Sequence, residues 1–550
     1  MIKNNRFKLD LWGLITLFFV LCYVAFLLIP LGMVLYQALF DKTNNSFTLE
    51  YFSKFFGKSY YFSTLINSFK VSICATFLSI LIGTPLAYFF TMFKLKGKKV
   101  LQTLIIIASM SAPFIGAYSW VLLLGRSGII TGFLKSFGIG DINIYGFSGI
   151  LLVFTCQLYP LIFLYVQGAL KNVDHSLIEA SKNLGCSNLK IFYKIVLPLI
   201  MPTILAGGLL VFVRAMSDFG TPMLIGEGYR TFPVLIFNEF MSEVSGDDGF
   251  ASAIAIMAVL ITAVIFLLMR YVSKRFSFSM SALHPIEAKK ISGIKSLLVY
   301  LYCYGVVMLS ILPQAFVIYT SFKNTKGLIF VDGYSFMSYQ QAFQRLGNSI
   351  VNTVLIPGTA LLLIVIVAVL ISYLAVRRRN FLTGFLDTIS MIPYVIPGSV
   401  LGIAFGITFK NKWITLSSFM LLVIAMVMRR LPYTIRSSAA ILHQIPMSIE
   451  EAAISLGASK LKTFIKVTMP MMASGIIAGA ILSWVTLISE LSTSIILYTT
   501  KTKTLTISIY TEVLRGNYGI GAALSTILTI MTIISLFIFY KISKGKDISI

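Results

Sequence analysis

Charged residues are scarce in this chain. Only 12% of its 550 residues are Asp, Glu, Lys or Arg, whereas 57% are apolar. A composition this apolar along the whole length excludes a soluble protein built around a single core. Acidic residues are scarcer than basic ones, and the formal net charge is +25. The cations lie in short clusters between apolar runs instead of on one basic face, which argues against a nucleic-acid partner.

Cysteines are few, and their spacing indicates neither a disulfide framework nor a metal site. The five are Cys22, Cys74, Cys156, Cys186 and Cys303. A phosphate-binding loop is lacking as well. Gly57-Lys58-Ser59 resembles the end of such a loop, but Phe52 occupies the position of its first glycine and no strand is predicted before it. We therefore expect this chain to bind no metal, cofactor or nucleotide.

Apolar stretches long enough to cross a membrane, roughly 20 residues each, occur twelve times. The first runs from Leu11 to Phe40 without a small-residue cleavage pattern, so it is predicted to be a retained helix and not a removed export signal. The sequence predicts an all-α polytopic membrane protein with about 12 transmembrane helices, at residues 12–37, 66–91, 100–124, 148–170, 203–225, 250–272, 296–320, 352–376, 384–407, 414–436, 474–497 and 518–540.

The loops between these stretches differ in charge. With both termini in the cytoplasm, about 28 Lys and Arg residues fall inside and about 14 outside. This excess fixes the predicted orientation, because cytoplasmic loops carry more positive charge.

A polar loop occurs twice, 272 residues apart. EASKNLGCSNLKIFYKIVLP (Glu179–Pro198) aligns without a gap with EAAISLGASKLKTFIKVTMP (Glu451–Pro470), and half of the aligned positions are identical. Both copies are predicted to face the cytoplasm. Their composition favours two short helical pieces joined by a turn at Gly185 or Gly457. An amphipathic helix held to lipid by its lysines is the alternative interpretation, and it explains one copy better than two copies in register.

Six predicted helices precede the linker at 276–295 and six follow it. The halves, 1–290 (core about 60–275) and 291–550 (core about 345–540), are therefore expected to form two parallel six-helix repeats. SDFGTPML from Ser217 aligns at the same offset with SELSTSII from Ser489.

This second aligned segment places two acids at equivalent positions near the fifth helix of each half. A carboxylate at the centre of a bilayer costs roughly 2.5 to 3.5 kcal/mol on insertion scales, so Asp218 and Glu490 need an explanation. In one interpretation they line a translocation path or gate together with Ser217 and Ser489. In the other, each acid accepts hydrogen bonds where a helix breaks.

Other polar and helix-breaking residues lie within the predicted spans. Arg214 is one turn from Asp218 and is a candidate counter-charge. Arg429, Arg430 and Arg436 either extend to the cytoplasmic surface, which we favour, or lock an inner gate. Prolines in 109–120 and 390–400 are expected to interrupt the third helix of each half.

The repeated loops resemble the cytoplasmic signature of membrane subunits of bacterial binding-protein-dependent ABC importers: Glu-Ala-Ala, three residues, Gly, nine residues, an apolar residue, two positions and Pro. The first copy departs from it only at Ser181. The resemblance implies a fused type I, MetI-like permease. In that family this segment docks an ATPase, so the implied coupling residues are Glu179, Ala180, Gly185, Glu451, Ala452 and Gly457.

The resemblance also implies the partners. It predicts one permease chain per complex in the bacterial plasma (inner) membrane, with two cytoplasmic ABC ATPase subunits that use ATP and Mg²⁺, an extracytoplasmic substrate-binding protein, and no enzyme activity in this chain. The candidate contacts for the binding protein lie in 226–249 and 498–517 and are Glu227, Glu239, Glu243, Asp247, Asp248 and Glu512. These loops are alternatively ordinary solvated segments.

The implied cargo is less specific. Within the family, a single chain with two fused halves is most similar to the ferric iron permeases, and the hard oxygen ligands of Asp218 and Glu490 are compatible with ferric iron. Phosphonate, sugar phosphate and thiamine are alternatives within the same importer class. A secondary transporter of the major facilitator type is the alternative from another class, but the paired Glu-Ala-Ala loops are not a feature of that family.

Overall fold

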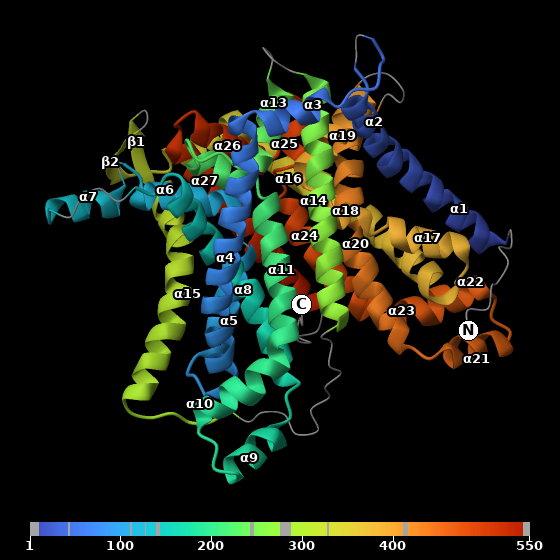
Figure 1. Cartoon of the computed structure of the whole chain (residues 1–550), viewed down its shortest axis with the longest axis horizontal. Coiled ribbons are helices and arrows are strands. Elements are labelled where there is room, and N and C mark those ends of the chain that lie inside the picture. The colour runs from blue at the N-terminus through green and yellow to red at the C-terminus, as the bar shows by residue number, and fades with distance from the viewer. Residues whose placement is uncertain are drawn as a thin grey trace.

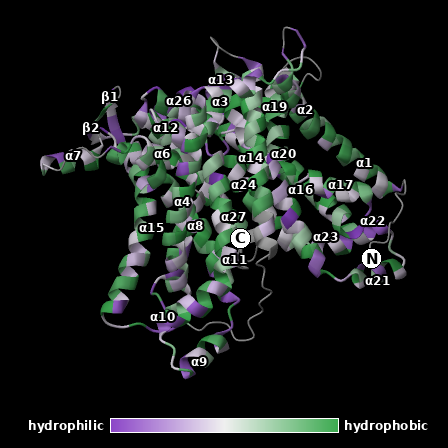
Figure 2. Cartoon of the chain, in the orientation of Figure 1, coloured by the Kyte–Doolittle hydropathy of each residue, from purple (hydrophilic) through white to green (hydrophobic). Residues whose placement is uncertain are grey.

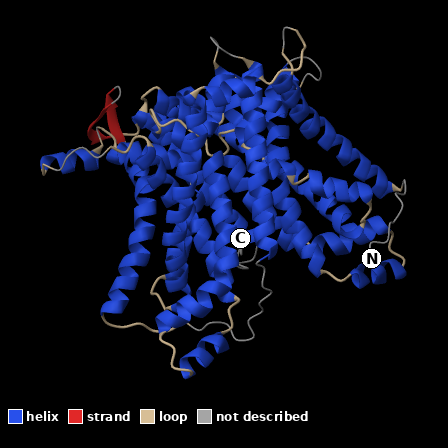
Figure 3. Cartoon of the chain, viewed as in Figure 1, coloured by secondary structure: helices blue, strands red, loops and turns tan. Residues whose placement is uncertain are grey.

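The computed structural model describes residues 10–41, 44–110, 113–126, 128–138, 143–242, 247–275, 288–326, 329–410 and 416–542 (Figure 1). Helices make up nearly all of this part of the chain, and its one sheet is a two-stranded hairpin (Figure 3). The expected all-α architecture is therefore confirmed.

The elements of the amino-terminal half are α1 (Leu11–Tyr23), the π-helical turn η1 (Val24–Leu28), α2 (Ile29–Leu39), α3 (Glu50–Gly57), α4 (Ser59–Met92), α5 (Lys98–Met110), α6 (Pro113–Leu124), α7 (Ile129–Ser136), α8 (Phe147–Lys171), α9 (His175–Asn183), α10 (Asn188–Ile191), the π-helical turn η2 (Phe192–Val196), α11 (Leu197–Ser217), α12 (Gly220–Ile225), α13 (Phe232–Met241) and α14 (Asp248–Arg275).

The elements of the second half are α15 (Ile294–Ser321), β1 (Lys323–Lys326), β2 (Ile329–Tyr334), α16 (Met337–Arg377), α17 (Phe381–Ile389), α18 (Ile392–Val395), α19 (Gly398–Lys410), α20 (Ser418–Gln444), α21 (Met447–Ser455), α22 (Lys460–Thr463), the π-helical turn η3 (Phe464–Thr468), α23 (Met469–Met471), α24 (Ala473–Ile488), α25 (Ser494–Leu497), the 3₁₀ turn η4 (Thr500–Thr502), α26 (Leu505–Leu514) and α27 (Tyr518–Ile542).

Membrane-spanning length and apolar composition occur twelve times in the described residues. Ten spans meet the criterion as continuous helices, and two further spans are bent, by 109° between α18 and α19 and by 67° between α23 and α24. The predicted count of about twelve is confirmed. The third predicted span differs, because α5 ends at Met110, α6 begins at Pro113, and the apolar stretch of spanning length is Phe114–Ser136.

Three prolines explain the three π-helical turns. Pro30, Pro198 and Pro470 each lie four residues after the centre of η1, η2 or η3. A proline ring collides with the carbonyl of the residue four positions earlier, and a widened turn at that residue relieves the collision. Pro198 and Pro470 thus mark the entry into α11 and α23, as the sequence predicts.

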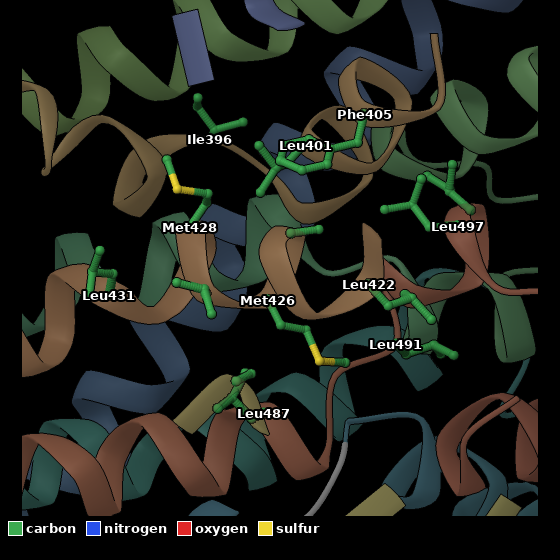
Figure 4. Packing of buried hydrophobic residues seen from close by; sticks show 14 of the residues in the cluster. Ile396, Leu401, Phe405, Leu422, Met426, Met428, Leu431, Leu487, Leu491 and Leu497 are labelled. Atoms are coloured by element: carbon green, nitrogen blue, oxygen red, sulfur yellow. The ribbon is translucent and has the colours of Figure 1, made fainter. Parts of the chain in front are cut away.

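The first span of each half packs against both halves. α2 contacts α14 of its own half and α19 of the other, while α15 contacts α27 of its own half and α5 and α6 of the other. One hydrophobic core accordingly combines α15 residues with those of the first half, and the other combines α1 and α2 residues with those of the second half. In the second core, α19 packs against α20, and Figure 4 shows Leu401 of α19 on one side of α20 and Met426 pointing from the other side toward Leu491.

The two repeated loops lie at the same end of the bundle. Figure 1 shows α9 with α10, and α21 with α22, along the lower side, whereas α13, α26 and the β1–β2 hairpin lie along the upper side. Polar residues gather at these two ends, and the helices between them are mainly apolar (Figure 2). This arrangement suits a protein that spans a bilayer with both loops on one side.

Candidate functional site

The repeated loops have the same backbone structure. A shift of 272 residues carries α9 onto α21, α10 onto α22 and η2 onto η3 with the same bounds. Gly185 (φ +78°) and Gly457 (φ +89°) each adopt the left-handed conformation just after the first helix. The next amide completes a helix-ending motif, with Cys186 N–H donating to Ser181 O at 3.0 Å and Ala458 N–H donating to Ala453 O at 3.1 Å.

Both loops present their distinctive residues to solvent. The six residues predicted to couple to a partner are all exposed: Glu179, Ala180, Gly185, Glu451, Ala452 and Gly457. Beside each glycine is a leucine that is almost fully exposed, Leu184 at 84% and Leu456 at 89%. These two exposed leucines, Leu184 and Leu456, therefore occupy equivalent positions at the tips of the two loops.

The loops differ in how they are fixed to the bundle. Glu450 at the base of α21 is buried and accepts a hydrogen bond from Arg377 Nε at 2.8 Å, and Arg377 Nη2 also donates to Ile445 O at 2.8 Å. The equivalent residue in α9 is Ile178, which is buried as an apolar side chain. The second loop is therefore attached to α16 by an ion pair, and the first by apolar packing.

The end of the segment that links the halves contacts the first loop. Lys289 pairs with the strand-like backbone at Phe93, and Lys94 N–H donates to Lys289 O at 2.9 Å. The pKa of the Lys182 side chain in α9 is lowered from its ordinary value, first by its hydrogen bond with Lys289 and then by partial burial.

A cavity of about 230 Å³ lies between the two halves. The first half contributes residues of α5, α6, α8 and α11, and the second half contributes residues of α18, α20 and α24 and the break after α18. All four residues predicted for a path or gate line this cavity: Ser217, Asp218, Ser489 and Glu490. The structure therefore brings together residues that the sequence places 272 positions apart.

Glu490 is held by two arginines. Its side chain is 3% exposed, and its carboxylate forms ion pairs with Arg429 and Arg430 of α20. It also accepts a hydrogen bond from Thr493 N–H at 3.1 Å. Because its oxygens are engaged by guanidinium groups, Glu490 is not a free oxygen ligand for a metal cation, contrary to the expectation drawn from its chemistry alone.

Asp218 makes the same backbone contact without the arginines. It follows the last residue of α11 and accepts a hydrogen bond from Thr221 N–H, at the start of α12, at 2.9 Å. Among the residues that the structure describes, Arg214 forms no ion pair with Asp218, so the sequence-based pairing is wrong. Both acids lie just beyond a helix end, accept a backbone hydrogen bond there and line the cavity, and their place in a translocation path stays a prediction.

The prediction that the arginines of α20 extend to the cytoplasmic surface is wrong for two of them. The side chains of Arg429 and Arg430 are 14% exposed and lie at the cavity, in the middle of α20. Only Arg436 of this group is largely exposed, at 54%, and it pairs with Asp387 at 3.4 Å. The pairing of Arg429 and Arg430 with Glu490 was not predicted from the sequence, although a carboxylate within an apolar stretch is itself a signal that a cation lies nearby.

The acids proposed as outer contacts have different surroundings. Glu227 is partly exposed and pairs with Arg126 at 3.0 Å. Glu512 is buried and pairs with Asn517 Nδ2 at 2.7 Å, so the expectation that it faces a partner is wrong. Asp247 accepts hydrogen bonds from the amides at the start of α14. Glu243 lies outside the described residues.

Most of the chain matches one known protein family. The family profile described as "Binding-protein-dependent transport system inner membrane component" matches residues 79–278 and 360–546, which together cover most of the chain. The chain belongs to this family. The two matched segments of this inner membrane component include both repeated loops and both sides of the cavity, and the resemblance inferred from the Glu-Ala-Ala loops is confirmed.

Several curated proteins are similar to this inner membrane component. The ferric transport system permease protein FbpB of Actinobacillus pleuropneumoniae is 26% identical over 531 residues, covering 95% of this chain and 76% of that protein. The spermidine/putrescine transport system permease protein PotB of Haemophilus influenzae is 30% identical over 49% of this chain and 95% of its own length. The putative 2-aminoethylphosphonate transport system permease protein PhnU of Salmonella typhimurium is 24% identical over 45% of this chain and 87% of its own length.

Proposed function

We propose that this inner membrane component is the transmembrane subunit of an ATP-driven importer. In this proposal, halves 1–290 and 291–550 form the translocation path between them. A binding protein delivers the cargo at the α13 and α26 end. Two separate ATPase subunits bind the two repeated loops in the cytoplasm, where both termini also lie. This chain supplies the path, and the partner subunits hydrolyse ATP with Mg²⁺.

The geometry of the two loops carries the proposal. The two loops have the same backbone structure, lie at one end of the bundle, and expose Leu184 and Leu456 beside their turns. Two equivalent surfaces fit two copies of one partner. A partner that binds one membrane conformation more tightly than the other shifts the population between conformations, which is how ATP-driven closure would open and close the path.

For the cargo we propose iron in the ferric state. The similarity to the ferric permease protein extends over 95% of this chain, whereas the polyamine and phosphonate relatives each match about half of it. This chain, with both halves in one polypeptide, is therefore comparable in organisation with the ferric permease. Phosphonates remain the alternative within the same importer class.

Co-purification tests the proposal. The chain is co-expressed with the ATPase and binding protein encoded nearest to it, and the ATPase retained after purification is measured together with uptake of radiolabelled iron. We expect Leu184→Ser with Leu456→Ser to lower ATPase retention about tenfold or more, because burying a leucine side chain contributes about 1.5 to 3 kcal/mol and about 1.4 kcal/mol is a tenfold change in affinity. Leu514→Ser, a change of an equally apolar exposed residue at the opposite end, is expected to leave retention unchanged. Equal retention by all three forms would contradict the proposal.

A further inference from the structure

The cavity between the halves contains more positive than negative side chains. Arg214, Arg429 and Arg430 line it together with two carboxylates, Asp218 and Glu490. Arginine stays protonated at any physiological pH, so this excess cannot be removed by loss of a proton.

The excess positive charge of the cavity is not spread evenly over its three arginines, because only two of them pair with a carboxylate. Arg429 and Arg430 share the carboxylate of Glu490. Asp218 accepts its hydrogen bond from a backbone amide. No carboxylate of the described residues lies within ion-pair distance of Arg214, and none of them hydrogen-bonds its side chain. Arg214 is half-buried at the cavity wall, and among the described residues its guanidinium group forms no ion pair, although Asp218 lines the same cavity.

A charge in a poorly hydrated cavity is costly unless an opposite charge or hydrogen bonds compensate it. The planar guanidinium group matches the paired oxygens of carboxylates and phosphates. Tyr394 and Tyr433 of the opposite half line the same cavity and offer phenolic donors, and Ser217 adds a hydroxyl. A bare cation entering the cavity would meet an uncompensated positive group instead.

We propose that the cargo crosses this cavity as an anion carrying carboxylate, phosphate or phosphonate oxygens, with Arg214 as its principal counter-charge. This inference rests on the proposed function and makes it more specific. Ferric iron would pass as an anionic complex with oxygen ligands, and not as the bare ion. A polyamine, which is a cation, would be excluded.

Thermal unfolding of the purified chain in detergent tests the inference without any partner. Inorganic phosphate, citrate and spermidine are each compared with chloride at matched ionic strength, because a ligand that binds only the folded state raises the melting temperature. We expect phosphate or citrate to raise it, spermidine to leave it unchanged, Arg214→Gln to abolish the rise, and Arg214→Lys to retain part of it. Arg379→Gln is the matched control, because Arg379 is exposed and lies away from the cavity.

Three results would overturn the inference: no rise with either oxyanion, the same rise in the Arg214→Gln form, or a rise with spermidine. Retention of the ATPase by the co-expressed complex described above is a separate measurement. If the ATPase is retained and an oxyanion has no effect, the anion inference fails while the importer assignment stands. If no ATPase is retained, the importer assignment fails.

Discussion

Glu490 and Arg429, 61 residues apart in the sequence, form a buried ion pair at the cavity between the two halves. The pair connects the break after α24 with the middle of α20, and Thr493 extends it by accepting from Arg429 Nη1 at 2.8 Å and donating to Gly398 O at 3.1 Å. The network therefore also reaches the start of α19, where the third helix of the second half is broken.

Loss of Glu490 is predicted to destabilise the protein strongly. Glu490→Gln leaves two buried guanidinium groups without their carboxylate, and such a loss costs about 3 to 5 kcal/mol in the free energy of unfolding. Asp218→Asn is the matched change in the first half, where no arginine depends on the acid, and we expect it to cost at most about 1 kcal/mol. Melting temperatures of the two variants in detergent make the comparison. Equal destabilisation would contradict the assigned partners.

The turn glycines are predicted to control the shape of the loops. A residue with a β-carbon in the left-handed conformation is disfavoured by about 1 to 2 kcal/mol, and a β-carbon at Gly185 or Gly457 would meet no other atom within 4 Å. Within this chain, Gly185→Val with Gly457→Val therefore acts through backbone conformation and not through a clash of the new β-carbon. We expect ATP hydrolysis by the purified complex to continue while uptake of the cargo falls.

Asparagine is the control at these two positions, because it tolerates the left-handed conformation. Gly185→Asn with Gly457→Asn is expected to retain most of the uptake. Full uptake in the valine form would show that the turns do not transmit the partner's movement.

The ion pair between Arg377 and Glu450, which attaches the second loop to α16, is predicted to be replaceable by apolar packing of the kind that holds the first loop at Ile178. Arg377→Leu alone leaves Glu450 buried without its partner and should lower the free energy of unfolding by about 3 to 5 kcal/mol. Arg377→Leu with Glu450→Ile imitates the apolar anchor at Ile178 and should recover most of that loss, since an apolar pair of similar volume often replaces a buried ion pair at little cost. Thermal unfolding of the single and double variants measures the recovery, and a double variant no more stable than the single one would refute this explanation.

Gly398 is predicted to admit no side chain. A β-carbon there would collide with the guanidinium group of Arg429, so Gly398→Ala displaces the arginine from Glu490. Overpacking of this kind costs about 1 to 3 kcal/mol. Gly406→Ala in the same helix is the control, because its β-carbon would meet Phe240 at an ordinary 3.4 Å. Similar melting temperatures for the two variants would show that Arg429 moves aside freely.

The membrane topology was predictable because each span needs only length and apolar composition. The predicted spans 148–170 and 518–540 differ by at most a few residues from α8 and α27. The π-helical turns were not predictable from proline alone, since Pro30, Pro198 and Pro470 each follow one whereas Pro85 and Pro160 lie inside α4 and α8 without one. The packing of α2 and α15 across the two halves was not predictable, because apolar surfaces facing lipid and facing protein have the same composition.

The candidate site was predictable in part. The alignment of the two halves at a constant offset was enough to choose Asp218 and Glu490 as candidate site residues. It did not show that they meet at one cavity, or that Glu490 is neutralised by residues of α20 while Asp218 is not. Arg429 aligns with Gln157 and Arg430 with Leu158 at the same offset, so the repeat gave no indication of the charge difference. Such pairings depend on how helices cross, and a linear pattern does not contain that information.

Cross-linking tests the central claim most directly. Single cysteines replace Leu184 or Leu456 in a form that lacks Cys22, Cys74, Cys156, Cys186 and Cys303, and a short bifunctional thiol reagent is applied to membranes that also contain the ATPase. We predict that a cysteine at either position is joined to the ATPase and that a cysteine replacing Leu514 is not. Cross-linking of the ATPase to the Leu514 position, or to neither loop, would contradict the account.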